Sequence, residues 1–201
     1  MKTRKTNGIL FTTLLKQGMR ELVVKKEEVF LIDRKEGFGE EFSKLISMMA
    51  YVRATTIAEV QGLSAEELDF RFQEDANSIG MLLAHMDSVE RFYQIDTFEQ
   101  REVTEDDVLH LNPGLELGDT AREQIHSQPA EHYLQKIEDS RKKTLDTFSK
   151  LPDSWLFEQA PFLYNEPTNN YFKWFHVFED ELNHRGQIRL IKKMMKTSVE
   201  A

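Results

Sequence analysis

The sequence predicts an all-α four-helix bundle, and two observations carry that prediction. Four long segments repeat apolar residues at intervals of three and four, which is the period of a helix with a buried face. No part of the chain shows a convincing strand pattern. Because helices with one apolar face bury it against each other, the four segments are expected to pack as a bundle.

The first two helices have clear start and stop signals. The first begins after Gly39 and ends near Gly62, and its apolar positions are Phe42, Leu45, Ile46, Met49, Ile57 and Val60. The second can be capped by Asn77 or Ser78 and extends to about Gln100. Its apolar positions are Ile79, Leu82, Leu83, Met86, Val89 and Tyr93.

A long crossover connection is predicted between the second and third helices. Residues 101–128 are polar and acidic and are broken by Asn112-Pro113-Gly114, so we expect a connection with short helical turns. Such a crossover indicates that the bundle is not simply up and down. The third helix begins at Pro129 and continues to Leu151-Pro152.

The fourth helix can be capped by Thr168 or Asn169 and extends to about Lys196. Its basic last turns suit the negative end of the helix dipole. Residues 1–35 show no sustained helical period, so we predict an irregular N-terminal extension, followed by one bundle domain over residues 36–201.

Composition excludes several classes of function. The formal net charge of -9 removes the general attraction to phosphate backbones, so nucleic acid is not an expected partner. No run is long and apolar enough for a membrane span, and the basic N-terminus lacks a clear cleavage site, so we expect a cytoplasmic protein without a membrane partner. The chain has no cysteine, so any transition metal must be held by nitrogen and oxygen ligands.

The fourth helix carries candidate metal ligands. His176, Asp180 and His184 are spaced by four and therefore share one helix face. The two histidines lie about 12 Å apart along the axis, so both cannot bind one ion without unusual stretching. Asp180 can pair with either one, and His85 on the second helix is the best candidate for a further ligand. The alternative is a buried ion pair of Asp180 with His184 or His176, since carboxylates four residues from a histidine are common in so acidic a chain.

Two further faces are predicted on this helix. The solvated face is expected to carry Glu181, Arg185 and Arg189, which suit surface ion pairs. A second apolar stripe is expected to pack against a neighbouring element or a second copy of the chain. It comprises Phe172, Phe175, Phe178 and Leu182.

Two segments together resemble the DinB-like (YfiT-like) metalloenzyme superfamily. They are Asn77-Ser-Ile-Gly-Met-Leu-Leu-Ala-His85 and Asp180-Glu-Leu-Asn-His184-Arg-Gly-Gln187, and the resemblance extends from about Gly37 to Lys196. It implies a four-helix bundle, frequently a homodimer, with nickel or zinc as the metal. It places His85 and His184 at two metal-binding positions, while Asp180 stands where the family usually has a histidine.

Two functional hypotheses follow. The first is a metal-dependent enzyme in which His85, Asp180 and His184 hold one divalent ion, with His176 and Gln187 beside it, contacting the ligands or the substrate. The resemblance implies thiol-dependent chemistry, so the small-molecule reaction is S-transfer with a low-molecular-weight thiol, or hydrolysis with bound water. Candidate bases, which spacing does not separate, are Glu90, Glu179 and Glu181. The second hypothesis is a non-catalytic dimeric bundle whose buried His/Asp cluster is structural.

Overall fold

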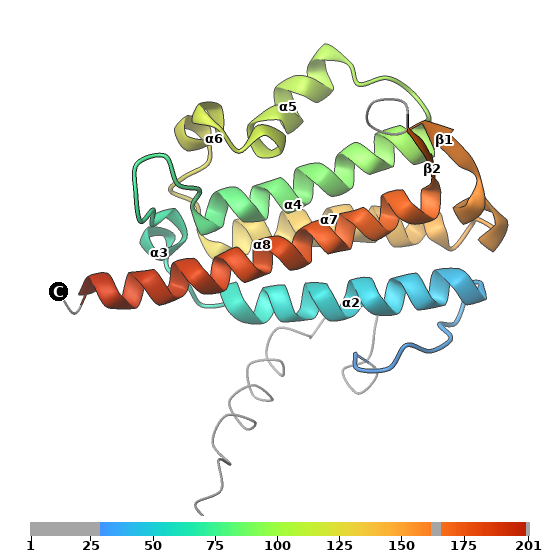
Figure 1. The fold of residues 1–201 in the computed structure, drawn as a ribbon, viewed down its shortest axis with the longest axis horizontal. Coiled ribbons are helices and arrows are strands. Elements are labelled where there is room, and N and C mark those ends of the chain that lie inside the picture. Colours follow the sequence, from blue (N-terminus) through green and yellow to red (C-terminus); the bar gives the residue numbers. More distant parts are fainter. Residues whose placement is uncertain (1–28, 162–165, 200–201) are drawn as a thin grey trace, which may run out of the picture.

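A computed structural model describes residues 29–161 and 166–199, and its architecture confirms the predicted all-α bundle. The long helices are α2 (Glu40–Val60), α4 (Ile79–Gln94), α7 (Ala130–Phe148) and α8 (Asn170–Val199). They lie side by side, with α8 between α2 and α4 in the view of Figure 1. The predicted extension falls mostly on residues 1–28, which lie outside the described residues.

Local capping explains where the helices begin. The hydroxyl of Ser78 accepts a hydrogen bond from the backbone N–H of Met81, so Ser78 is the cap of α4. The side-chain oxygen of Asn169 accepts from the N–H of Phe172 at 2.9 Å at the start of α8. After α4 the chain continues through a π-helical turn, η2 (Ile95–Glu99).

The crossover contains more helix than the sequence predicted. It forms α5 (Glu105–Glu116) and α6 (Asp119–Gln124), and α5 passes through Pro113 and Gly114 without ending. A capping box between Thr104 and Asp107 begins α5. The helix continues past the expected break because it lies along α4, as Figure 1 shows, and this packing outweighs the local preference.

The short elements lie at the connections. A capping box of Ser64 and Glu67 begins α3 (Ala65–Asp69), which was not predicted. Between α7 and α8 the chain forms a 3₁₀ turn, η3 (Asp153–Phe157), and two short antiparallel strands. These strands, β1 (Gln159–Pro161) and β2 (Pro167–Asn169), were also absent from the sequence prediction.

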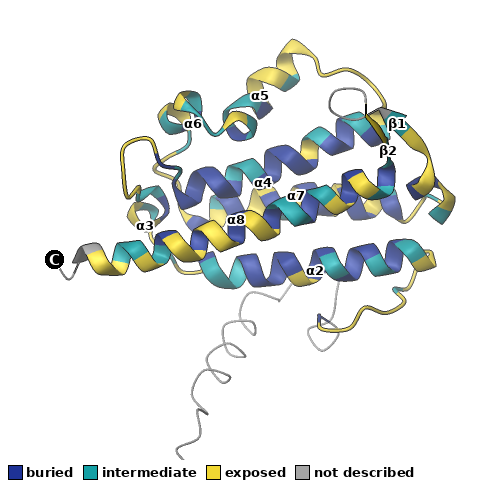
Figure 2. Cartoon of the chain, in the orientation of Figure 1, coloured by how far each residue is buried: buried dark blue, intermediate teal, exposed yellow. Residues whose placement is uncertain are grey.

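The apolar core has two parts along the bundle axis, and a buried charged layer lies between them. One part surrounds Trp174 and Phe148, and the other surrounds Leu82 and Ile137. On α8, for example, buried apolar residues precede Glu181 in the first part and follow it in the second. Figure 2 shows the corresponding dark inner faces of the helices.

Each long helix contributes one residue to the charged layer. Arg53 Nε lies 3.0 Å from Glu181 Oε1, and Arg53 Nη2 lies 3.0 Å from Glu90 Oε2. Arg141 Nε lies 2.8 Å from Glu90 Oε1, and its Nη2 lies 3.5 Å from Glu181 Oε2. Two guanidiniums and two carboxylates therefore compensate one another within the core, and each side chain is at most 5% exposed.

The prediction that Glu181 and Arg185 face solvent is wrong. Glu181 is 1% exposed, and Arg185 is 8% exposed and donates to the Thr55 hydroxyl. Their face of α8 packs against α2, which covers it (Figure 1). Arg189, further along, does lie at the surface, with its Nε 2.7 Å from Glu59 Oε1.

Within the described residues, no helix has both the length and the apolar character needed to cross a membrane.

Candidate metal centre

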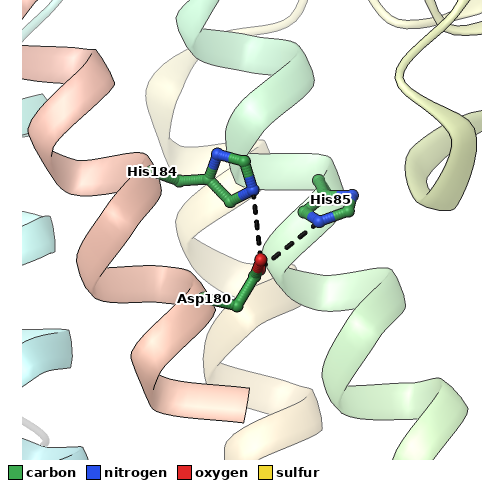
Figure 3. A group of neighbouring side chains, drawn as sticks. All are labelled: His85, Asp180 and His184. Atoms are coloured by element: carbon green, nitrogen blue, oxygen red, sulfur yellow. Dashed lines mark ion pairs between the residues drawn. The ribbon is translucent and has the colours of Figure 1, made fainter. Parts of the chain in front are cut away.

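Three side chains from α4 and α8 converge at one point, as Figure 3 shows. His85 Nε2 lies 3.3 Å from Asp180 Oδ2, and His184 Nε2 lies 3.4 Å from Asp180 Oδ1. The potential ligand atoms of these three residues all lie within 4.8 Å of one another. The four-residue spacing brings Asp180 and His184 to one face of α8, and the packing of α4 against α8 brings His85 to them.

In each histidine, the ring nitrogen that faces away from Asp180, Nδ1, has a hydrogen-bond partner. His85 Nδ1 lies 2.9 Å from the backbone oxygen of Gly114 on α5, and a carbonyl can only accept, so Nδ1 carries a proton. His184 Nδ1 lies 3.1 Å from Gln187 Oε1, one turn further along α8. In the neutral imidazoles, both Nε2 lone pairs therefore face Asp180, as they do in metal sites with supporting partners.

The donor set fits a divalent cation. Two imidazole lone pairs and a carboxylate form a group of electron-pair donors without a hydrogen donor of its own. Asp180 Oδ2 is buried and makes no directed hydrogen bond in the described part of the chain, which leaves it available to a cation. A positive charge between these atoms, from a proton or a metal, is needed to stabilise them.

The acid–base properties of the cluster reflect the same need. Burial alone would raise the pKa of Asp180, but the imidazoles of His184 and His85 outweigh it and hold that pKa well below its ordinary value. Burial would lower the pKa of His184, but Asp180 outweighs burial and raises it. Both shifts show that a positive charge, here a proton on His184, is stabilised beside the Asp180 carboxylate.

The cluster lies near the surface of the bundle. The side chains of His85, Asp180 and His184 are 12%, 19% and 11% exposed, although Asp180 Oδ2 itself is buried. The cluster is therefore less deeply buried than the charged layer, whose side chains are at most 5% exposed.

His176 does not join this cluster. Its Nδ1 lies 3.1 Å from Glu179 Oε2, and its ring stacks on Phe172 and meets the edge of Tyr93. Over residues 29–161 and 166–199, the group of metal-type ligands comprises only His85, Asp180 and His184. The sequence analysis expected that His176 and His184 could not both bind one ion, because the helical rise separates them, and this placement agrees with that expectation.

Two of the three candidate bases are committed to ion pairs. Glu90 and Glu181 both belong to the buried charged layer and bind guanidiniums. Glu179 contacts His176 and the Asn183 amide at the surface. The sequence analysis also missed the Gly114 carbonyl that holds His85. A glycine within the crossover was its only local signal.

The fold and the cluster define the class of protein, an all-α bundle with a candidate metal site of two imidazoles and one carboxylate between neighbouring helices. A family model described as mycothiol-S-transferase matches residues 44–196. The chain belongs to this family, and thereby to the DinB-like metalloenzyme superfamily, which confirms the resemblance stated above. Among curated proteins, no match was found.

Proposed function

We propose that this protein is a divalent-metal-dependent S-transferase that uses a low-molecular-weight thiol. The observation that carries the proposal is the convergence of His85, Asp180 and His184, with their ligand atoms within 4.8 Å and both histidines held through Nδ1. Membership of the mycothiol-S-transferase family supports a thiol as cosubstrate. The chain contains no cysteine, so the reacting sulfur must come from that cosubstrate.

In this proposal the three side chains hold the metal and the rest of the site orients them. A bound divalent ion supplies a Lewis acid that lowers the pKa of a thiol or water brought to it. Gly114 and Gln187 keep the Nε2 atoms of His85 and His184 directed inward. Asp180 contributes a negative charge, which offsets part of the charge of the ion.

The overall reaction transfers sulfur to an electrophilic carbon. The thiol passes its proton to water, its sulfur forms the new S–C bond, and the leaving group departs with the electron pair of the bond that breaks. Hydrolysis is the alternative reaction, in which water replaces the thiol. We place His176 beside the path of the substrate rather than on the metal, because it is partly exposed one turn before Asp180.

Zinc or nickel is the proposed metal. Two imidazoles and one carboxylate are a ligand set that zinc enzymes use, with further positions open to substrate. Imidazole also suits nickel. A cytoplasmic location is proposed because low-molecular-weight thiols are kept reduced there.

Metal content and thermal stability test the proposal together. Protein purified without chelator or affinity tag is expected to contain about one metal ion per chain. Asp180→Ala and His184→Ala are expected to lose that metal. Asp180→His, which introduces the usual residue of the family, should retain it, and Glu179→Ala is the matched control on the same helix.

Chelation distinguishes the structural alternative. If metal binds, a free concentration of about 100 times the dissociation constant adds about 2.7 kcal/mol to the free energy of unfolding, so EDTA lowers the melting temperature of the wild type. A structural His/Asp cluster predicts no effect of EDTA. Two results together would refute the proposed site. The purified wild type would contain no metal, and Asp180→Ala would bind added zinc and nickel as the wild type does.

We also propose that the protein is a homodimer through the outer face of α8. Phe172, Phe175 and Leu182 are 46%, 41% and 42% exposed, whereas Phe178 of the same predicted stripe is buried. Exposed aromatic residues grouped on one helix are typical of protein interfaces. Light scattering should give a dimer for wild type and a monomer for Phe175→Glu. A monomeric wild type would contradict the proposal.

A further inference from the structure

A cavity lies under the crossover, apart from the metal cluster. It has a volume of about 290 Å³ and is lined by residues of α4, α5 and α7, together with the end of α6 and the segment that follows it. The α4 residues that line it are Ala84, Asp87, Ser88 and Arg91, which share one face at steps of three and four. His85 is directed about 100° away around the helix, toward α8.

The cavity combines a cationic rim with a buried carboxylate. Arg91 and Lys136 both line it, and both residues are exposed. Asp87 is buried, and Arg91 Nη1 approaches its Oδ2 only to 3.6 Å. This separation is too long for a strong hydrogen bond, so the Arg91 guanidinium retains donors for another anion. Two cations against one carboxylate leave the cavity with a net positive charge.

The remaining lining supplies neutral polar groups and apolar contacts. Tyr133 lines the cavity, although its hydroxyl lies toward Gly80, which is outside the lining. His132 also lines the cavity, and burial lowers its pKa, which favours the neutral imidazole. Leu109 and Pro113 provide apolar contact from α5. Ligand pockets in proteins show this mixture of apolar walls and a few polar groups, and the volume suits a small molecule.

We propose that this cavity binds a small organic anion, whose carboxylate or phosphate group pairs with Arg91 and Lys136. A hydroxyl or amino group of the same molecule donates to the Asp87 carboxylate. Guanidinium and ammonium groups recognise carboxylate and phosphate by the same charge-assisted hydrogen bonds. The buried carboxylate selects anions that also carry a donor.

The cavity shares a wall with the metal cluster. Gly114 lines the cavity, and its carbonyl oxygen is the partner of His85 Nδ1. A Cβ at position 114 would lie 2.2 Å from Ser88 Oγ and 2.9 Å from the Ala84 oxygen, so α5 contacts α4 closely at this point. A ligand that moves α5 therefore changes the support of His85. This coupling rests on the proposed metal site, whereas binding in the cavity does not.

Calorimetric titration of the full chain tests the binding, with glycerol 3-phosphate and 3-hydroxybutyrate as probes and glycerol as the neutral control. At least one anion is expected to bind with a dissociation constant of about 1 mM or lower, and glycerol is not. In Lys136→Gln, and in the Arg91→Gln/Lys136→Gln double variant, that affinity should fall about tenfold or more. Lys142→Gln, an exposed lysine on α7 outside the cavity lining, is the matched control and should bind like wild type.

Each outcome decides the proposal. Binding of one anion alone supports it and identifies phosphate or carboxylate as the recognised group. Absence of heat with both anions, equal binding of glycerol, or an equal loss in Lys142→Gln would overturn it. Because the titration is performed with metal-free protein from which the chelator has been dialysed away, failure of the metal site leaves this result unchanged.

Discussion

Removing Glu181 from the buried charged layer should strongly destabilise the protein. Glu181 is 1% exposed, and its carboxylate lies 3.0 Å from Arg53 and 3.5 Å from Arg141. Glu181→Ala leaves two buried guanidiniums with only Glu90 as a carboxylate partner. Breaking a buried pair in this way costs about 3–5 kcal/mol, which lowers the melting temperature of a domain of this size by about 6–20 °C.

Urea unfolding followed by circular dichroism measures this cost. EDTA is added so that any metal at the neighbouring Asp180 does not contribute. Glu179→Ala is the matched control, because Glu179 pairs with the partly exposed His176 and should cost at most about 1 kcal/mol. Glu181→Gln retains the side-chain size and one acceptor, so an intermediate loss is expected. If Glu181→Ala lies within about 1 kcal/mol of the Glu179→Ala control at equal m-values, the layer does not have the assigned role.

Three further predictions concern packing and pH. Gly114→Ala should cost about 1–3 kcal/mol, because its Cβ would lie 2.2 Å from Ser88 Oγ, whereas Gly186→Ala on α8 meets no atom within 4 Å and should be neutral or slightly stabilising. Equal urea midpoints for the two variants would contradict this packing. Burial alone would raise the pKa of Glu90, but two guanidiniums hold that pKa below its ordinary value. The unfolded chain therefore binds this proton more readily, and the resulting stability is present above about pH 4.5 and lost as the pH falls through the lowered pKa. A free energy of unfolding that does not decrease between about pH 5 and about pH 3 would argue against it. Zinc binding competes with protonation of His184, whose pKa is raised by its carboxylate partner, so zinc affinity should be greater at about pH 8 than at about pH 6, as a competing chelator can measure. Equal affinities at the two pH values would exclude His184 as a ligand.

Local spacing in the sequence was sufficient to predict the fold class and to select the three residues of the cluster as candidates. Helical periodicity depends on near neighbours in the chain, so the four long helices could be located without tertiary information. The four-residue step also placed Asp180 and His184 on one face, and the rise per residue separated His176 from His184. The position of His85 within the second helix then indicated a third member, and the structure brings the three together.

The tertiary structure decided which faces are buried and what supports the cluster. Glu181 and Arg185 have the spacing of a solvated ion-pair face, yet α2 covers them, and Glu181 gains Arg53 from a helix 128 residues away along the chain. Asn112-Pro113-Gly114 predicts a break, yet contact with α4 keeps α5 helical and places the Gly114 carbonyl against His85. Both outcomes depend on partners distant in the sequence. Such contacts leave no periodic signal in one chain, because periodicity reports that a face is buried and not which element covers it.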